Sequence, residues 1–238
     1  ATFFVDDVLA EGRSATLGEA EAHHAQVRRV AVGDRVRLID GRGSVAEGPV
    51  VRLAKSAGLV DVERVSMVEP LPEIHLVVPI ADRDRMLWLA EKATELGLTS
   101  WRPVMWRRSR SVSPRGEGVA FQAKLRARMI SALAQSGGAW LPSLFPDATL
   151  ERAIAATPQG TGLVLDADGD PMLAQRAITP VTLVLGPEGG IEPEEREQLI
   201  AAGFALVSIA PNTLRFETAG VAGLAIACAM IGRLKAGR

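Results

Sequence analysis

The segment LVLGPEGGIEPEE, residues 183–195, is the most informative part of the sequence. An apolar run leads into the glycine-rich loop 186–190, and Pro193 stands where a helix would begin, a position that proline favours. Glycines let the backbone turn sharply and approach a ligand closely. In open α/β sheets, ligands bind beyond the carboxyl ends of the strands. The segment therefore predicts a buried strand, a ligand-binding loop and a helix.

The charges around this loop restrict the class of ligand. A phosphate site would need a lysine or an open helix N-terminus, whereas the carboxylates here suit the helix dipole and would repel a phosphate. Neither a GxGxxG nor a GxxxxGK[ST] pattern occurs in the chain. We hypothesise a ligand without phosphates and with a positive centre, for which the sulfonium of S-adenosylmethionine qualifies; an ordinary strand-to-helix turn with solvated acids is the alternative. The acids are Glu188, Glu192, Glu194 and Glu195.

A second segment, IAPNTLRFETAGVAGLAIACAM at residues 209–230, has a similar organisation. A strand is expected to end near Ala210, and a turn then leads into a helix rich in alanine and glycine. Such a helix allows close packing by a neighbouring helix or by another subunit. Arg215 and Glu217 bracket an aromatic residue at the start of this apolar helix. Charges in such a place are costly unless they are paired or used, so both are candidate functional residues.

Outward from these loops, the chain from residue 73 onward alternates between apolar strands and helices. Continuous apolar strands separated by helices predict a parallel sheet covered on both faces, which is an α/β fold. The expected strands are 74–80, 100–106, 162–166, 182–186 and 205–210. The expected helices are 83–97, 117–136, 193–202 and 216–234.

Residues 1–70 have a different character. Short apolar runs at 35–39, 45–54 and 59–68 alternate with glycine turns, which predicts a small β-barrel or sandwich. One short helix is expected at 18–30. Pro70 and Pro72 stiffen the chain and mark a boundary. We therefore predict two domains, 1–70 and 73–238.

The totals exclude several classes of protein. The 238 residues are 47% hydrophobic with a net charge of −1, and the one cysteine, Cys228, excludes an internal disulfide. One cysteine and three histidines at unrelated spacings suggest no metal site. The N-terminus does not resemble a signal peptide, and no apolar run is long enough for a membrane helix, so a cytoplasmic protein is expected. The arginines between residues 95 and 117 form a basic stretch that suits an RNA-facing surface.

Taken together, GPEGG at 186–190 and LRFETA at 214–219 resemble the SPOUT methyltransferases, and more narrowly the ribosomal RNA small subunit methyltransferase E family. Glu91 to Gly97 resembles that family's KATELG helix, and Arg107 to Ser111 its Arg-Ser segment. Matches to its PUA-like domain are His23-His24, Arg28-Arg29-Val30, Gly33-Asp34 and Asp40-Gly41.

The resemblance implies methylation at N3 of a uridine in 16S ribosomal RNA, with S-adenosylmethionine as methyl donor. It also implies a PUA-like barrel followed by a SPOUT domain with a trefoil knot, in a homodimer. Two stretches depart from the family pattern. Residues 134–138 lack its Glu and Arg, and residues 210–213 lack its Gly-x-Arg.

Site residues follow from the loops and the resemblance. Arg215 is expected to stabilise the uracil anion, and Glu217 is a weaker candidate for the base, with water as the alternative. The residues expected to bind RNA are His24, Arg28, Arg29, Arg107, Arg108 and Arg110. The residues expected to bind the cofactor are Leu165, Gly186, Pro187, Glu188, Gly189, Gly190, Ile209, Asn212, Leu214, Arg215, Thr218 and Ala219.

Three other functions remain open on the sequence. A nucleotide-dependent oxidoreductase would bind NAD, although the glycine fingerprint is missing. A ribosome-associated factor would bind RNA without methyl transfer. A related SPOUT enzyme would methylate a ribose 2′-hydroxyl instead of a base.

Overall fold

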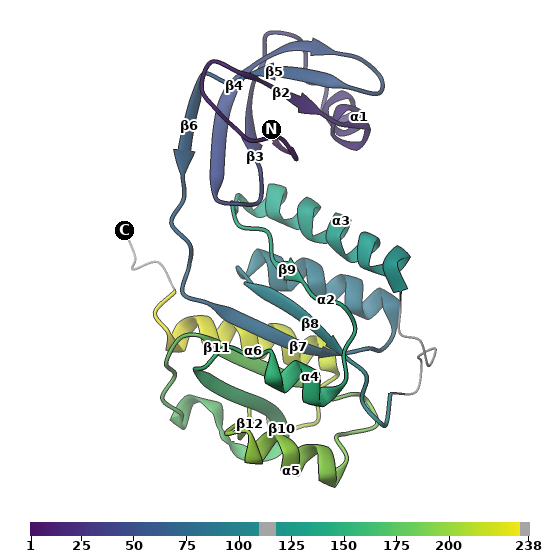
Figure 1. The fold of residues 1–238 in the computed structure, drawn as a ribbon, viewed down its shortest axis with the longest axis vertical. Helices are drawn as coiled ribbons and strands as arrows, with labels where there is room; N and C mark the ends of the chain where they lie inside the picture. Colours follow the sequence, from purple (N-terminus) through teal and green to yellow (C-terminus); the bar gives the residue numbers. More distant parts are fainter. Residues whose placement is uncertain (110–117, 234–238) are drawn as a thin grey trace. The chain divides into compact units, whose positions relative to one another are not determined.

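The computed structural model of the chain describes residues 1–109 and 118–233. Contacts divide the chain into two compact units (Figure 1). The first unit contains Ala1–Pro70 and Ile130–Leu141, and the second contains Leu71–Met129 and Pro142–Arg238. Within the described residues no helix is long and apolar enough to cross a membrane.

The first unit is a strongly bent sheet of short strands with one helix. The order is β1-β3-β4-β5-β2, with β6 also paired to β4, and every pair except β1 with β3 is antiparallel. The strand expected at 59–68 is in fact two strands, β5 and β6, which pair with opposite ends of β4. The elements are β1 Thr2–Phe4, β2 Ser14–Leu17, α1 Glu19–Val27, β3 Arg35–Ile39, β4 Ser44–Leu53, β5 Gly58–Asp61 and β6 Arg64–Met67.

Gly48 marks the place where β4 passes from one half of this sheet to the other. Its backbone lies so close to the end of β5 that a Cβ at this position would collide with the carbonyl oxygen of Asp61. Glycine therefore permits the close approach that bends the sheet. The bend encloses a core that includes Phe3, Leu17, Leu38, Val50 and Val60.

Helix α1 ends in an unusual way. The N–H of Arg29 donates to the carbonyl of Gln26, and the N–H of Val30 donates to that of Ala25, both at 2.9 Å. This pattern closes a helix with one left-handed residue, which is usually glycine. Here the left-handed residue is Arg29, with φ of 56°. An L-residue in this conformation costs roughly 1–2 kcal/mol.

The first unit also includes the end of helix α3, Gly118–Ser136, and the turn after it. Leu133 and Ala139 are buried with Phe4, Ile39 and Val45 in one apolar cluster. The indole N–H of Trp140 donates to the carbonyl of Val68 at 2.9 Å, and the Arg37 guanidinium donates to the carbonyl of Gly137 at 3.2 Å. We predicted that the first domain is the continuous stretch 1–70, which does not include this segment. Contacts place residues Ile130–Leu141 in the first unit as well.

The second unit is built on a parallel sheet with the order β12-β10-β11-β7-β8-β9. Its central strands are buried at every position, as their unbroken apolar sequences predict. Strand β10 is longer than expected, and β9 and α4 were not predicted. The strands are β7 Ile74–Pro79, β8 Ser100–Val104, β9 Ser143–Leu144, β10 Thr161–Pro171, β11 Val181–Leu185 and β12 Ala205–Ser208.

Helices cover both faces of this sheet. Leu150 of α4 and Leu199 of α5 share a core with Val77, Val164 and Val184. On the opposite face α6 packs against α2 and β11. The bounds are α2 Arg83–Glu95, α4 Leu150–Ala155, η1 Met172–Ala174, α5 Pro193–Ala201 and α6 Phe216–Met230. The trefoil knot implied by the resemblance stays a prediction.

Candidate active site

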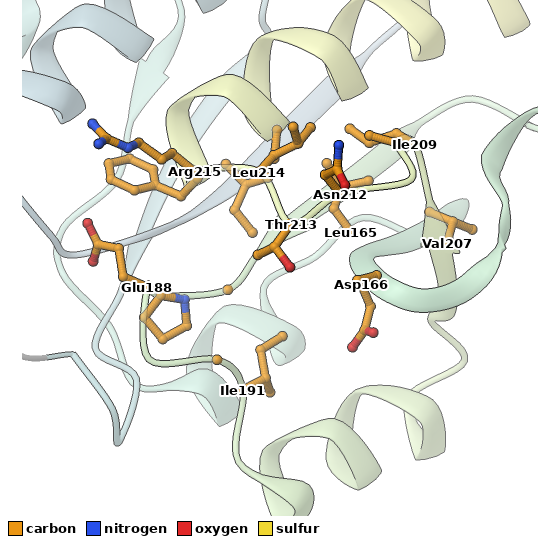
Figure 2. A pocket seen from close by; sticks show the side chains of 18 residues that line it. Leu165, Asp166, Glu188, Ile191, Val207, Ile209, Asn212, Thr213, Leu214 and Arg215 are labelled. Atoms are coloured by element: carbon orange, nitrogen blue, oxygen red, sulfur yellow. The ribbon is translucent and has the colours of Figure 1, made fainter.

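The two loops singled out from the sequence meet at one cavity of about 410 Å³ (Figure 2). The cavity lies at the carboxyl ends of β11 and β12, next to the irregular middle of β10, at the edge where a parallel sheet is expected to bind its ligand. The first loop joins β11 to α5, and the second joins β12 to α6. The local sequence predicts both correctly, because glycine, proline and asparagine turns interrupt apolar strands there.

Most of the residues expected to bind the cofactor line this cavity. Gly189 and Thr218 do not line it. Gly189 lies instead beneath Arg108, whose Cβ would be 2.9 Å from a Cβ at that glycine. The predicted residues that line the cavity are Leu165, Gly186, Pro187, Glu188, Gly190, Ile209, Asn212, Leu214, Arg215 and Ala219.

Other lining residues were missed from the sequence. Asp166 is the last residue of the strand predicted at 162–166, so its position at the carboxyl end was a signal that could have identified it. Ile191 lies one residue beyond the glycine loop. Val207 belongs to a predicted strand, but the sequence did not indicate which side chains of that strand face the cavity. The missed residues are Asp166, Ala167, Leu185, Ile191, Val207, Ala210, Thr213 and Phe216.

The wall of the cavity is largely apolar, with charges at separate places. Leu165, Val207 and Ile209 lie on the side labelled at the right of Figure 2, and Arg215 and Glu188 lie together at the left. Asp166 forms an ion pair of 3.6 Å with Arg196 of α5. Such a cavity suits an uncharged aromatic or aliphatic group between fixed polar ends, and it offers no phosphate cradle.

Glu217, the weaker candidate for the base, does not line the cavity. It is 8% exposed, and its Oε2 is buried without a hydrogen-bond partner among the described residues. Its Oε1 lies 3.8 Å from Nε of Arg85, whose Nη1 donates to Oε1 of Glu188 at 3.1 Å. Arg85, on the first turn of α2, therefore connects the carboxylate at the cavity wall to the buried one.

We expect Arg85→Ala to destabilise the fold by about 1–3 kcal/mol, because the buried Glu217 carboxylate would lose its nearby cation. Glu217→Gln in the same chain should restore part of the loss, since the uncompensated charge is then absent. Urea unfolding of the two single variants and the double variant measures this coupling. Strict additivity of the two substitutions would contradict the pairing.

Comparison with known proteins identifies the family to which this chain belongs. Residues 68–228 match the model of a family described as an RNA methyltransferase domain, and residues 17–63 match an RNA methyltransferase PUA domain. The ribosomal RNA small subunit methyltransferase E of Mycobacterium tuberculosis is 30% identical over 235 residues, covering 93% of this chain and 88% of that protein. The chain belongs to the ribosomal RNA small subunit methyltransferase E family.

Solved structures agree with this assignment. The methyltransferase E of Neisseria gonorrhoeae, bound to S-adenosyl methionine, is 26% identical with a TM-score of 0.88, over 96% of this chain and 97% of that one. A probable rRNA-methyltransferase of Porphyromonas gingivalis is 26% identical with a TM-score of 0.81, over 98% of each chain. The predictions of the methyltransferase E family and of an α/β fold with a PUA-like domain are confirmed.

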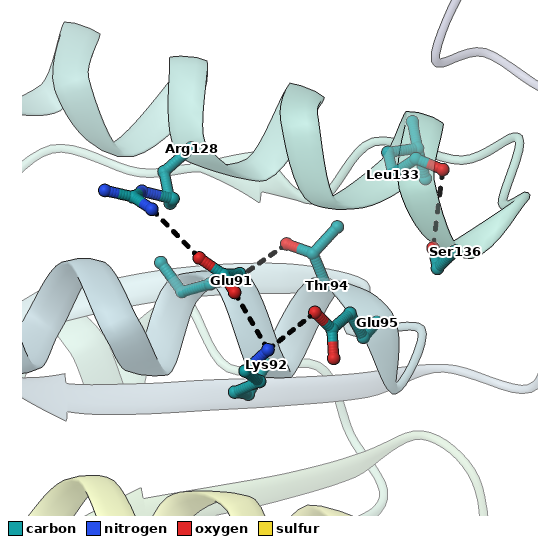
Figure 3. A network of polar contacts seen from close by, with 8 residues as sticks. Glu91, Lys92, Thr94, Glu95, Arg128, Leu133 and Ser136 are labelled. Carbon is teal, nitrogen blue, oxygen red and sulfur yellow. Dashed lines mark hydrogen bonds and ion pairs between the residues drawn. The ribbon is translucent and has the colours of Figure 1, made fainter. Parts of the chain in front are cut away.

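The KATELG helix that marks methyltransferase E proteins is α2 in this structure. Nζ of Lys92 donates to Glu91 at 2.8 Å and to Glu95 at 2.9 Å, and Arg128 of α3 donates to Glu91 at 3.0 Å (Figure 3). The hydrogen bond from Lys92 lowers the pKa of Glu91. Thr94 is buried and donates to the carbonyl of Ala90. In the described structure, the motif's charged side chains form a surface network and do not line the cavity.

The basic stretch expected to bind RNA is partly paired within the fold. The Arg108 guanidinium makes two hydrogen bonds to Glu192, at 2.6 and 3.0 Å, which raise its pKa, and a third to the carbonyl of Gly189. Nη1 of Arg107 forms an ion pair with Oε2 of Glu194 at 3.4 Å. The acids at the start of α5 therefore neutralise arginines that the sequence places more than 80 residues away. Arg110, also expected to bind RNA, lies outside the described residues.

The two stretches that depart from the methyltransferase E pattern lie in different parts of the structure, one at the end of α3 and one at the cavity. Gly137 has φ of 77° just after α3, so the glycines there end that helix where the family has charged residues. In the other stretch, Ala210, Asn212 and Thr213 line the cavity. The second departure therefore alters the cavity wall, whereas the first alters a helix end.

Proposed function

We propose that this chain transfers a methyl group from S-adenosylmethionine to N3 of a uridine in the 16S ribosomal RNA of the small subunit. The observation that carries the proposal is the cavity formed by the 186–190 and 209–215 loops, in a chain that belongs to the methyltransferase E family. The methyltransferase E of Neisseria gonorrhoeae, with the same fold, was solved with S-adenosyl methionine bound.

The residues of the cavity fit this methyl donor. Leu165, Val207 and Ile209 provide apolar surface for an adenine ring, and backbone groups of the two glycine-rich and asparagine-containing turns provide polar contacts. Asp166 and Glu188 are carboxylates of the cavity lining, which would suit a positively charged sulfonium and would repel a phosphate. When bound, the donor supplies an activated methyl group. The roles of the individual cofactor-binding residues follow from this proposal.

Arg215 is proposed as the residue that stabilises the reacting uracil. Arg215 is an exposed residue that lines the cavity at the same end as Glu188 (Figure 2). Loss of the N3 proton spreads negative charge onto the carbonyl oxygens of uracil, and a fixed cation beside them lowers the barrier. Glu217 lies outside the cavity and is compensated by Arg85, so we assign proton acceptance to water at the open mouth.

The RNA has to present an unpaired base. N3 is on the pairing edge of uracil, so the target nucleotide must be single-stranded or turned out of its helix before transfer. Arg28 and Arg29 of the first unit are proposed to hold the RNA backbone, because phosphate contacts fix position without reading sequence. Arg107 and Arg108 would do so only by exchanging Glu194 and Glu192 for phosphates.

A homodimer and a cytoplasmic location complete the proposal. The exposed face of α6 carries only small residues at Thr218, Ala225 and Ala229, which allows a second copy to approach closely. Light scattering of the purified chain measures its mass, and a monomer at micromolar concentration would contradict the dimer. The cytoplasmic location is proposed because the proposed substrate, the small ribosomal subunit, is cytoplasmic.

Nucleoside analysis tests the activity directly. We expect 16S ribosomal RNA from cells lacking the gene to lose 3-methyluridine, and the purified chain with S-adenosylmethionine to restore it. Appearance of a 2′-O-methylated nucleoside instead would favour the related ribose methyltransferases. RNA binding without any methyl transfer would favour a ribosome-associated factor. Tight binding of NAD, with none of S-adenosylmethionine, would favour an oxidoreductase.

A further inference from the structure

Two arginines and two carboxylates gather at one end of the methyl-transfer cavity. Arg215 and Glu188 line the cavity there (Figure 2). Arg85, on the first turn of α2, contacts both Glu188 and Glu217 but does not line the cavity. The four formal charges sum to zero, yet the pairing is unequal, because Arg85 contacts both carboxylates and Arg215 pairs with neither in the described structure.

The Arg215 side chain is a cation without a partner. It makes no hydrogen bond and no ion pair to any residue within 1–109 and 118–233. A carboxylate at the same end of the cavity, Glu188, is the partner that a guanidinium would ordinarily take, since such pairs form strong charge-assisted hydrogen bonds. What holds Glu188 therefore decides whether Arg215 stays free.

Glu188 is held by Arg85. Nη1 of Arg85 donates to Oε1 of Glu188 at 3.1 Å, and the Glu188 side chain has no other polar contact in the part of the chain that the structure describes. The side chain is 41% exposed and extends from the glycine-rich loop 186–190. If Arg85 were lost, no polar group among the described residues would keep this carboxylate in its place.

Arg85 is itself fixed at two points. Its backbone N–H donates to the side chain of Asp82, which caps α2, at 3.0 Å. Its Nε lies 3.8 Å from Oε1 of Glu217, a side chain that is 11% exposed. Because a buried carboxylate is costly without a cation, this contact keeps the Arg85 guanidinium next to α6. Both the backbone and the guanidinium are therefore held, as expected of a residue that positions another.

We propose that Arg85 is a positioning residue for methyl transfer, which holds Glu188 away from Arg215 and so leaves the Arg215 guanidinium free for the uracil anion. An ion pair between Arg215 and Glu188 would occupy the donors that the anion needs. It would also bring a carboxylate close to the reacting base, and a nearby anion opposes loss of the N3 proton. The inference rests on the proposed function, because it takes the role of Arg215 from there.

Arg85→Ala should lower the single-turnover rate at saturating RNA and S-adenosylmethionine by about tenfold or more, but by less than the loss expected for Arg215→Ala. The loss should disappear when the carboxylate is absent. In a Glu188→Gln chain, adding Arg85→Ala should change the rate by no more than about twofold, since the two substitutions act through one contact. A long-range effect of the Arg85 charge would instead persist in that chain.

Two controls separate positioning from stability. Glu217→Gln in the Arg85→Ala chain should restore part of the stability but not the rate, since Glu188 is still not held. This more stable chain serves for the same comparison, with and without Glu188→Gln, if Arg85→Ala alone does not fold. Arg128→Ala removes another arginine that pairs with a carboxylate of α2, Glu91, which does not line the cavity, and should leave the rate unchanged.

A crystal structure of the Arg85→Ala chain tests the geometry without any activity. It should show the Glu188 carboxylate within about 4 Å of the Arg215 guanidinium, the distance of an ion pair. A Glu188 that stays apart from Arg215 overturns the proposal. An equal loss of rate with and without Glu188→Gln also overturns it, as does a rate restored by Glu217→Gln. A parent chain that makes no 3-methyluridine would refute the proposed function, and the crystal structure would still decide what Arg85 holds.

Discussion

Replacing Arg215 with alanine should lower the rate of methyl transfer by about 100- to 1,000-fold, with a much smaller change in the affinity for S-adenosylmethionine. Removal of one group that stabilises a developing oxyanion typically costs this much in kcat. Arg215 lies on the wall of the cavity and is an exposed residue, so its substitution should leave the buried core intact. Single-turnover kinetics with saturating RNA measures the rate.

Arg215→Lys is the matched variant. It keeps the positive charge but loses the planar fork of donors, so we expect it to recover only part of the rate. Calorimetry with S-adenosylmethionine confirms that both variants retain the cavity. Turnover of Arg215→Ala equal to that of the parent would eliminate the role assigned to this residue.

Replacing Gly186 with valine should weaken the binding of S-adenosylmethionine by about 5- to 150-fold. A Cβ at this position would lie 2.8 Å from Cγ1 and 3.2 Å from Cδ1 of Ile191, which itself lines the cavity. Overpacking of this kind costs roughly 1–3 kcal/mol. The isoleucine has to move, and the displaced side chain or loop narrows the space for the ligand.

The compensating variant is Ile191→Ala in the Gly186→Val chain. Shortening the isoleucine removes the atoms that the new side chain meets, so the double variant should bind the methyl donor more tightly than Gly186→Val alone. Calorimetry on the two single variants and the double variant gives the coupling free energy. A double variant weaker than either single one would mean that Gly186 matters for another reason.

The sequence was sufficient for the parts of the site that depend on local structure. Strand β11 and the glycine loop after it are adjacent in the chain, and apolar strands followed by turn residues predict both. The same holds for the turn before α6. The parallel sheet followed from unbroken apolar strands between helices, because only sheets covered on both faces bury every side chain of a strand.

Contacts between distant segments were the part that could not be predicted. Glu217 was assigned to the reaction because a charge at the start of an apolar helix needs a partner, and its partner, Arg85, is more than 130 residues earlier. Arg107 and Arg108 looked like free cations, since the acids at the start of α5 lie far along the chain. The periodicity of a sequence carries no information on which charges the fold brings together.

Helix α3 and the turn after it limit how this protein can be divided or recombined. A fragment that begins after Pro70 would keep Leu133 and Ala139 but lose Phe4, Ile39 and Val45, the partners of their apolar cluster. Such a fragment would expose apolar surface and is expected to aggregate. A chimaera between two relatives would therefore have to exchange residues 130–141 together with the N-terminal unit. Although a short proline-containing linker joins the two units, residues 130–141 belong to the first unit, so neither unit can be exchanged without regard to this segment.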